Sequence, residues 1–240
     1  MDILLTIFNN LIFQPIVNLL VIFIDILPGA NLGVAIILVT VLIRLALFPL
    51  SYKALKSQKE LSTLQPKIKE IQKKHKKDKE AQSRAIMEFY KEHKINPFSG
   101  CVPFLIQLPI ILGMYRVFLT ELEPGNIEGL YSFVSQPEYI NTMFLSINLA
   151  EQSLILAILA GLAQFVLSKT TFSQKKKIGK TKSGSQPDFQ KIMGKQMTYI
   201  LPFITIFIAR SFPAGLVLYW FTTTVFSFGQ QYSINKKFED

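Results

Sequence analysis

Long apolar runs alternate with shorter polar segments along the chain. Each run is continuous, as in membrane helices, whereas the strands of a membrane barrel alternate apolar and polar positions over about 10 residues. This pattern predicts an all-α polytopic membrane protein with five transmembrane helices. The predicted spans cover residues 31–50, 97–118, 149–168, 196–210 and 214–233.

Residues 1–30 are apolar but carry polar side chains along one side. At about 100° per residue these side chains fall within an arc of about 120°; they are Thr6, Asn10, Gln14, Asn18 and Asp25. We therefore predict an amphipathic helix in the outer interface, kinked near Pro15 and ended by Pro28-Gly29. The alternatives are a sixth span or an uncleaved signal anchor. A cleaved signal peptide is not expected, because the segment has no basic residue before its apolar run.

Basic residues are concentrated in a few segments, and this gives the chain an orientation. Of 26 lysines and arginines, 23 lie in residues 51–96, in residues 169–195 or in the tail from Lys236. Residues 1–30 and 119–150 contain acidic residues and no basic one. The positive-inside rule then places the basic segments in the cytoplasm. We expect a multi-pass protein of the cell (plasma or inner) membrane, with an extracytoplasmic segment at 119–148 and a cytoplasmic C-terminal tail at 234–240.

Residues 51–96 carry apolar side chains at helical spacing on both sides of a polar centre. Leu61, Leu64, Ile68 and Ile71 follow one another at intervals of 3, 4 and 3 residues. This predicts a cytoplasmic hairpin of two antiparallel amphipathic helices; a solvated loop with some helical content is the alternative. The tip would dock on anionic lipid, ribosomal RNA or an acidic partner. The docking residues at this tip are Lys73, Lys74, Lys76 and Lys77.

The second basic segment, residues 169–195, is rich in Lys, Ser, Gly and Thr and poor in apolar residues. It predicts a flexible cytoplasmic loop.

The span that follows this loop, 196–210, is about 22 Å long as a helix, whereas the hydrocarbon core is about 30 Å thick. So short a span is expected to thin the bilayer. The alternative is a helix that begins earlier, through Lys191–Lys195.

Arg44 lies in the inner half of the first predicted span. A charge at this depth costs about 2.5–3.5 kcal/mol on insertion scales. Arg44 is about 13 Å from Lys53 along a helix, which is further than snorkelling covers. No acidic residue stands opposite it within the predicted spans. We therefore predict that Arg44 faces a hydrated recess and attracts an incoming carboxylate. The alternative is a structural arginine that reaches the inner head groups.

Other polar residues within the spans are candidates for the same recess. They are Thr40, Gln107, Gln164, Thr222 and Thr223. Thr40 lies one helical turn before Arg44 and on the same face. Pro103 and Pro109 are expected to bend the second span and to leave space beside it. Each polar residue could instead form an interhelical hydrogen bond.

The sequence contains no grouping that is typical of an enzyme. His75 and His93 both lie in the lysine-rich segment, and Cys101 is the single cysteine, so neither a metal site nor an internal disulfide is predicted. Nucleophile, metalloprotease and nucleotide-binding motifs are absent from the sequence. We expect no catalysis, no metal and no cofactor.

Several motifs are shared with a known family. They are R-L-A-L-F-P-L, the L-Q-P that enters the lysine-rich helix, N-P-F-S-G-C-V-P, Q-L-P-I and P-A-G-L-V-L-Y-W. With these motifs, residues 30–235 resemble YidC-type membrane protein insertases (the YidC/Oxa/Alb family). The resemblance implies a five-transmembrane-helix insertase core with a cytoplasmic helical hairpin. It also implies a hydrophilic groove that is open to cytoplasm and lipid and closed outside, with Arg44 as the groove arginine.

The resemblance further implies a function. Such a protein inserts nascent membrane proteins and helps them to fold; the expected partners are the ribosome, the signal recognition particle pathway, the Sec translocon and the lipid bilayer. We expect an acidic or polar segment of the substrate to pair with Arg44, while its apolar helix enters lipid along the third and fifth spans. The predicted apolar lining is Leu154, Leu156, Trp220 and Phe221.

Relative to the family, the sequence shows neither the large periplasmic domain of some members nor the lipoprotein cysteine of others, and its tail is short. Ribosome contact is therefore expected through the loops. Two other functions are considered. A small-solute transporter would be expected to show inverted repeats, and none is visible. A membrane-anchored nucleic-acid binder would interleave its lysines with stacking aromatic residues, and residues 51–96 do not.

Overall fold

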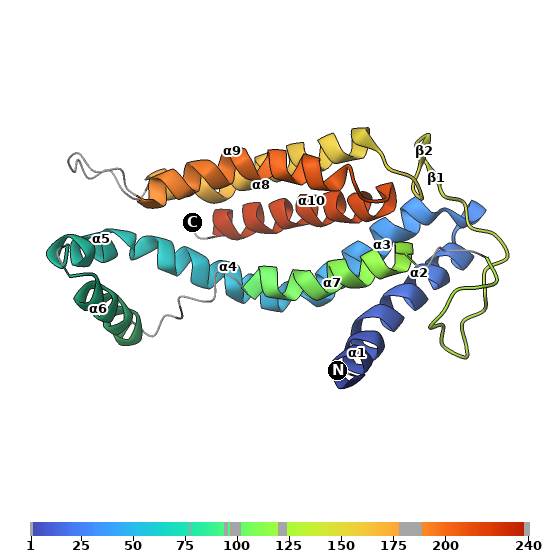
Figure 1. The fold of residues 1–240 in the computed structure, drawn as a ribbon, viewed down its shortest axis with the longest axis horizontal. Coiled ribbons are helices and arrows are strands. Elements are labelled where there is room, and N and C mark those ends of the chain that lie inside the picture. The colour runs from blue at the N-terminus through green and yellow to red at the C-terminus, as the bar shows by residue number, and fades with distance from the viewer. Residues whose placement is uncertain are drawn as a thin grey trace.

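The computed structural model describes residues 2–76, 78–93, 96, 102–119, 124–177 and 189–237. These residues are mostly helical, which confirms the all-α prediction. Figure 1 shows two groups of helices along the long axis, with α8, α9 and α10 on one side and α3, α4 and α7 on the other. The helices α5 and α6 lie at one end, and residues 124–153, with their two short strands, lie at the opposite end.

The N-terminal helix runs without interruption from α1 (Asp2–Phe8) through a π turn, η1 (Asn9–Phe13), to α2 (Gln14–Ile26). Leu27 is extended, and Pro28–Ala30 form a 3₁₀ turn, as the Pro-Gly pair predicts. The segment Ile3–Ile26 is long and apolar enough to cross a membrane. This length favours the alternative of a span over the interfacial helix, and the position of the helix in the bilayer remains a prediction.

The two halves of this helix differ in burial. Most of α2 is buried against α3 and α7, whereas the described side chains of α1 are exposed except for Phe8, which packs partly against the core. The predicted polar face does not form one solvated surface, because Asn18 is fully buried. Its amide donates to the carbonyls of Gln14 and Gly129, at 2.7 and 2.9 Å, and accepts from the backbone N–H of Tyr131 at 2.7 Å.

The first predicted span divides into α3 (Leu32–Ala46) and α4 (Phe48–Thr63), with a bend of 62° between them. The Asn31 side chain caps α3 by accepting from the backbone N–H of Val34 at 3.1 Å. The chain continues through α5 (Gln65–Lys74) and α6 (Lys79–Glu92), which pack against each other. Gln82 donates from its amide to the carbonyl of Gln72 at 2.9 Å. The helical hairpin is thus confirmed.

The remaining helices are α7 (Val102–Leu119), α8 (Leu154–Lys177), α9 (Phe189–Ala209) and α10 (Ala214–Lys237). The first residues of the predicted second span, 97–101, lie outside the described residues. One expectation needs correction. The predicted flexible loop 169–195 is helical at 169–177 and again from residue 189, while 178–188 lie outside the described residues. The helix α9 has 21 residues, about 31 Å, so it begins before the predicted span, as the alternative held. Its apolar part, Thr198–Ala209, is short, and thinning of the bilayer stays a prediction.

The helix α10 is the centre of the bundle. It packs against α3, α4, α7 and α8, and its residues Leu216–Tyr219 are buried. The helix α9 packs mainly on α8, where Gly161 allows a close approach: a Cβ built at this glycine would lie 2.3 Å from the Ile206 side chain. Most of the buried apolar residues among those described form one core, to which α2 also contributes.

Residues 124–153 fold over one end of the bundle. The strands β1 (Met143–Phe144) and β2 (Ile147–Asn148) form a small antiparallel hairpin. Backbone hydrogen bonds join this segment to α3 and to α10: Leu32 donates to Asn141 at 3.0 Å, and Gly215 donates to Leu149 at 2.9 Å. We call this the capped end. The predicted third span, 149–168, begins as a helix only at Leu154, because residues 149–153 take part in this cap.

Candidate functional site

The site contains the one arginine that the sequence places in the inner half of a span. Arg44 lies near the end of α3 and is half-buried. Its Nη2 donates a hydrogen bond to Oε1 of Gln107 on α7, at 2.8 Å. The amide nitrogen of Gln107 in turn donates to the phenol oxygen of Tyr219 on α10. This chain of side chains joins three helices, and we call it the Arg44 link.

The partner of Arg44 is a neutral amide. Arg44 forms no ion pair with the residues that the structure describes; the ion pair of Arg84 with Glu80 lies elsewhere, on the exposed surface of α6. A neutral partner satisfies one donor of the guanidinium, which has five N–H donors, and leaves its charge uncompensated. Arg44 and Gln107 are both half-buried, so part of each side chain is accessible from outside the bundle. A group with negative charge could therefore bind here without breaking an internal ion pair.

The structure brings some predicted recess residues to this link and not others. Thr223 lies one turn beyond Tyr219 on α10; it is buried, and its hydroxyl has no hydrogen-bond partner among the described residues. Thr40 is fully buried and donates to the carbonyl of Ile36 at 2.6 Å, within its own helix. The hydroxyl of Thr222 is likewise bonded within α10, to the carbonyl of Leu218.

Gln164 makes its hydrogen bond along α8 rather than toward the Arg44 link. Its amide donates to Oγ of Ser168 at 3.3 Å.

The residue that the sequence pattern did not predict is Tyr219, which completes the Arg44 link and is 2% exposed. A signal was present, since Tyr219 lies four residues before Thr223 and therefore on the same face of α10.

The predicted apolar lining is divided between surface and core. Leu154 is 60% exposed, whereas Leu156 is 5% exposed and belongs to the core. Trp220 and Phe221 are half-buried. Leu156 is therefore not available to a substrate in this arrangement, because neighbouring helices cover it.

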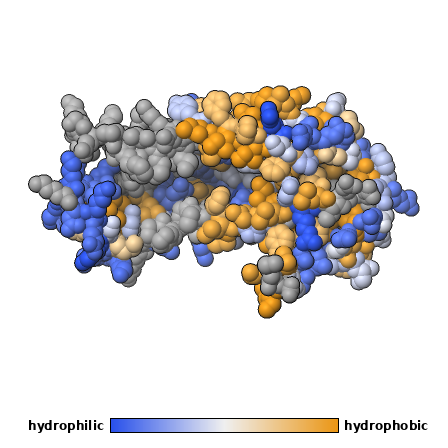
Figure 2. Space-filling model, viewed as in Figure 1, coloured by the Kyte–Doolittle hydropathy of each residue, from blue (hydrophilic) through white to orange (hydrophobic). Residues whose placement is uncertain are grey.

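Exposed apolar residues gather on α7, α8 and α9. On α8 they are Leu154, Ile155, Ile158, Leu159, Leu162 and Val166. On α7 they are Phe104, Leu105, Leu108, Leu112 and Leu119, and on α9 they are Ile200, Phe203, Ile204, Phe207 and Ile208. Figure 2 shows apolar residues over much of the bundle and hydrophilic residues over α5 and α6. The same view shows a hollow in this face, between the side of α10 and the side of α4 and α7.

The lysines proposed for docking lie at the tip of the hairpin. Lys73, Lys74 and Lys76 are exposed. Lys77 lies outside the described residues. These exposed cations stand at the end of the molecule opposite the capped end (Figure 1).

The comparisons with known proteins agree in pointing to one family. Residues 23–240 match a family model described as "60Kd inner membrane protein". A protein of Geobacter sp. (strain M21), named "Membrane protein insertase YidC", is 34% identical over 209 residues, which are 87% of this chain and 34% of that protein. A protein of Francisella tularensis subsp. novicida (strain U112) with the same name is 36% identical over 209 residues, 87% of this chain and 33% of its own.

Among solved structures, the chain is similar to one titled "Active YidC insertase crystal structure with the first transmembrane domain resolved". The TM-score is 0.58 and the identity is 29%, over 85% of this chain and 42% of that one. The chain thus spans about one third of the length of the curated relatives that it matches.

Proposed function

Because the chain belongs to the 60Kd inner membrane protein family, we propose that it inserts nascent membrane proteins into the bilayer and helps them to fold. The observation that carries this proposal is an arginine inside the helical bundle whose hydrogen-bond partner is a neutral amide. This function consists of binding and release and requires no covalent chemistry. Its substrates are the polar segments and apolar helices of membrane proteins.

The first step is capture of a polar segment. In our proposal, a short segment of the substrate, often acidic, enters the hollow between α10 and α7 and pairs with Arg44. The neutral partner Gln107 supports this role, because it holds the guanidinium in place without neutralising it. The pairing is transient, since a charge in a hydrated recess is only partly desolvated and its ion pairs are correspondingly weak.

The second step is release of the apolar helix into lipid. The sequence-based expectation used the third and fifth spans as the path. The first turns of α10 are buried, whereas α8, the third span, exposes apolar side chains between Leu154 and Val166. The exposed apolar residues of α7 and α9 offer a further path, because a helix that leaves along them also meets surface that is suited to acyl chains. We propose that the substrate helix leaves between α7 and α9.

The orientation follows from the distribution of charge. The lysine-rich hairpin and the C-terminal tail would lie in the cytoplasm, and the capped end would lie outside. The exposed lysines at the tip, Lys73, Lys74 and Lys76, would then meet a ribosome, the signal recognition particle pathway, the Sec translocon or anionic lipid. The closed cap would keep the outer side sealed while the recess admits the substrate.

The experiment uses the purified chain in liposomes and a series of single-span substrates. Their short outer segments carry no, one or two acidic residues, and insertion is scored by protease protection. Replacing Arg44 with Ala should lower insertion of the acidic substrates about tenfold, which corresponds to about 1.4 kcal/mol, and should affect the neutral substrate less.

A second variant tests the charge rather than the side chain. Gln107→Glu places a carboxylate where the amide now accepts from Arg44, so it should form an internal ion pair and also remove the preference for acidic substrates. Gln107→Met removes the hydrogen bond without adding charge, and it should keep the preference. Equal insertion of all substrates by the wild type and the three variants would contradict the proposed function.

A further inference from the structure

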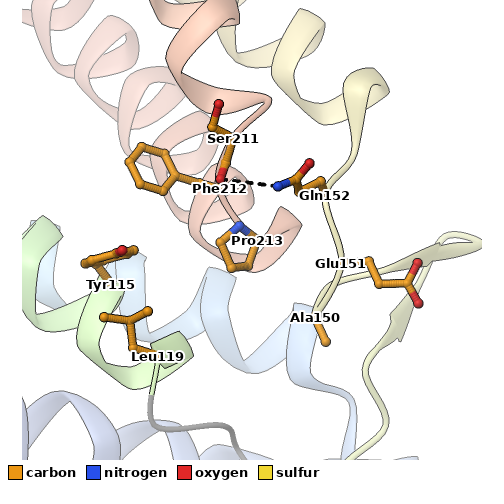
Figure 3. Close-up of a pocket in the computed structure, with 8 residues that line it drawn as sticks. All are labelled: Tyr115, Leu119, Ala150, Glu151, Gln152, Ser211, Phe212 and Pro213. Atoms are coloured by element: carbon orange, nitrogen blue, oxygen red, sulfur yellow. Dashed lines mark hydrogen bonds between the residues drawn. The ribbon is translucent and has the colours of Figure 1, made fainter.

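A cavity of about 580 Å³ opens at the capped end, between three parts of the chain. Its walls are the end of α7 (Tyr115 and Leu119), residues 150–152 and the turn 211–213 between α9 and α10. Figure 3 shows these side chains around the opening. Its volume lies within the range of about 300–1,000 Å³ that is usual for small-molecule sites. We call it the outer pocket.

The walls of the outer pocket are held firmly. Ala214 donates its backbone N–H to the carbonyl of Glu151 at 2.7 Å, so the loop and the turn pair like two strands. The rings of Tyr115 and Phe212 meet edge to face, with centroids 5.4 Å apart. Gln152 lies across the opening from Ser211 and donates toward its carbonyl at 3.5 Å (Figure 3). The pocket is therefore a property of the fold rather than of one loose side chain.

Two apolar stripes lead into this polar opening. On α7, Leu105, Leu108 and Leu112 are exposed and fall with Tyr115 and Leu119 within an arc of about 80°. On α9, Ile200, Ile204 and Phe207 are exposed and share a face, and the turn that follows α9 contains Ser211. Both stripes end at residues that line the pocket. The site therefore combines two long apolar walls with a polar opening. This arrangement is complementary to an amphiphile, which has apolar chains and a polar head group.

The charge around the pocket favours a negative group. The one acidic side chain among the described lining residues, Glu151, points away from the opening in Figure 3. Its carboxylate accepts instead from the Asn148 amide at 2.7 Å. Arg210 immediately precedes the lining residue Ser211, is exposed, and lies over the ring of Phe207, with its guanidinium carbon 5.6 Å from the centroid. A phosphate at the mouth of the pocket would be within the reach of this cation.

We propose that the outer pocket binds the head group of a phospholipid, with the phosphate at Arg210 and the two acyl chains along the exposed stripes of α7 and α9. The inference rests on the proposed function for its orientation and for the path between these helices. A lateral opening in a bilayer is filled by lipid when no protein helix occupies it, and the polar pocket selects a lipid that carries a head group. A substrate helix must displace this phospholipid before it leaves along the same walls.

The test measures lipid retention without any substrate. The full-length chain is purified from nanodiscs of phosphatidylethanolamine and phosphatidylglycerol, and bound phospholipid is counted by native mass spectrometry. The wild type should retain one phospholipid. Arg210→Gln removes the phosphate contact, and Leu119→Trp fills the pocket from an exposed position while it leaves Arg210 in place. Each variant should bind the phospholipid about tenfold more weakly.

The matched control is Arg84→Gln, which removes the same charge from the exposed surface of α6, far from the pocket (Figure 1). It should retain phospholipid as the wild type does, and diacylglycerol, which has no phosphate, should not be retained by any variant. The proposal is overturned if the wild type retains no phospholipid, if both pocket variants retain it undiminished, or if diacylglycerol binds equally well. Because no substrate is present, these results are independent of the insertion assay.

Discussion

The capped end and the Arg44 link, which lies further along the bundle, are held together by different kinds of contact. At the capped end, backbone hydrogen bonds join residues 124–153 to α3 and α10, and two glycines allow aromatic rings to touch the helix backbones. At the Arg44 link, long polar side chains bridge α3, α7 and α10, and a buried hydroxyl one turn beyond it on α10 has no partner among the described residues.

This difference separates stability from function. Backbone pairs and glycine contacts have no side-chain freedom, so they fix one arrangement and resist opening. Side chains such as Arg44 and Gln107 can exchange their partners for water or for a substrate at small cost wherever water reaches them, because an internal hydrogen bond is then nearly balanced by one to solvent. In the proposed function, the rigid capped end would stay closed while the Arg44 link admits a chain from the opposite side.

The largest expected effect comes from the rigid end. A Cβ at Gly215 would lie 2.2 Å from the ring of Phe118, so Gly215→Ala forces the ring to move and should cost about 1–3 kcal/mol of unfolding free energy. Gly229 lies on the same helix with no atom within 4 Å of such a Cβ, and Gly229→Ala should be neutral or stabilising by up to about 1 kcal/mol. Thermal unfolding in detergent compares them. Equal stability of the two variants would mean that the cap is not tightly packed.

A second substitution removes the hydrogen bonds between α2 and residues 124–153. Asn18→Ala leaves the carbonyl of Gly129 and the N–H of Tyr131 without their present partner, which should cost about 1–3 kcal/mol. Hydrogen exchange should become faster in residues 127–136 while exchange around the Arg44 link is unchanged. Asn10→Ala, at an exposed position of the same continuous helix, is the control and should leave exchange unaltered. Faster exchange in both regions would show that they are coupled.

The smallest effect is expected beside the Arg44 link. Thr223 has a buried hydroxyl with no partner in the described part of the chain, so Thr223→Val should be neutral or slightly stabilising, by less than about 1 kcal/mol. The next residue, Thr224, donates to the carbonyl of Trp220 at 2.8 Å, and its replacement by Val should cost about 0.5–1.5 kcal/mol. The free energy of unfolding and the yield of insertion are measured for both variants. A clear loss of insertion in Thr223→Val would mean that this hydroxyl contacts water or substrate during the reaction.

The helical class and part of the site could be predicted from the sequence, because they depend on local signals. A polar residue within an apolar run is conspicuous, and both Arg44 and Gln107 were found in this way. Tyr219 was not found, because an aromatic residue in an apolar run is expected to belong to the core. Its hydrogen-bond partner, Gln107, is 112 residues away in the sequence. Leu156 was misplaced because α8 is apolar on several sides, so its sequence does not show which side is covered.

Two other differences between the predicted and the observed structure have local causes that the pattern of apolar and polar residues does not reveal. The π turn at Asn9–Phe13 holds more residues than an α turn, so an arc computed at about 100° per residue does not follow the real face of the N-terminal helix. The lysine-rich residues before the fourth span have the composition of a loop, yet α9 begins at Phe189 and includes them. Lysine has good helix propensity, and a helix that leaves the membrane can continue into water.

The tip of the β1–β2 hairpin offers a place for a topological label. Leu145 and Ser146 both have positive φ, of 46° and 67°, and Leu145 is 82% exposed. Asn and Gly adopt this backbone conformation at a lower cost in energy than Leu and Ser. A short reporter inserted here with Asn and Gly beside it should therefore be accepted without strain. A tag here would stand on the outer side of the membrane if the charge distribution sets the orientation, and its accessibility to an impermeant reagent in intact cells would establish that sidedness directly.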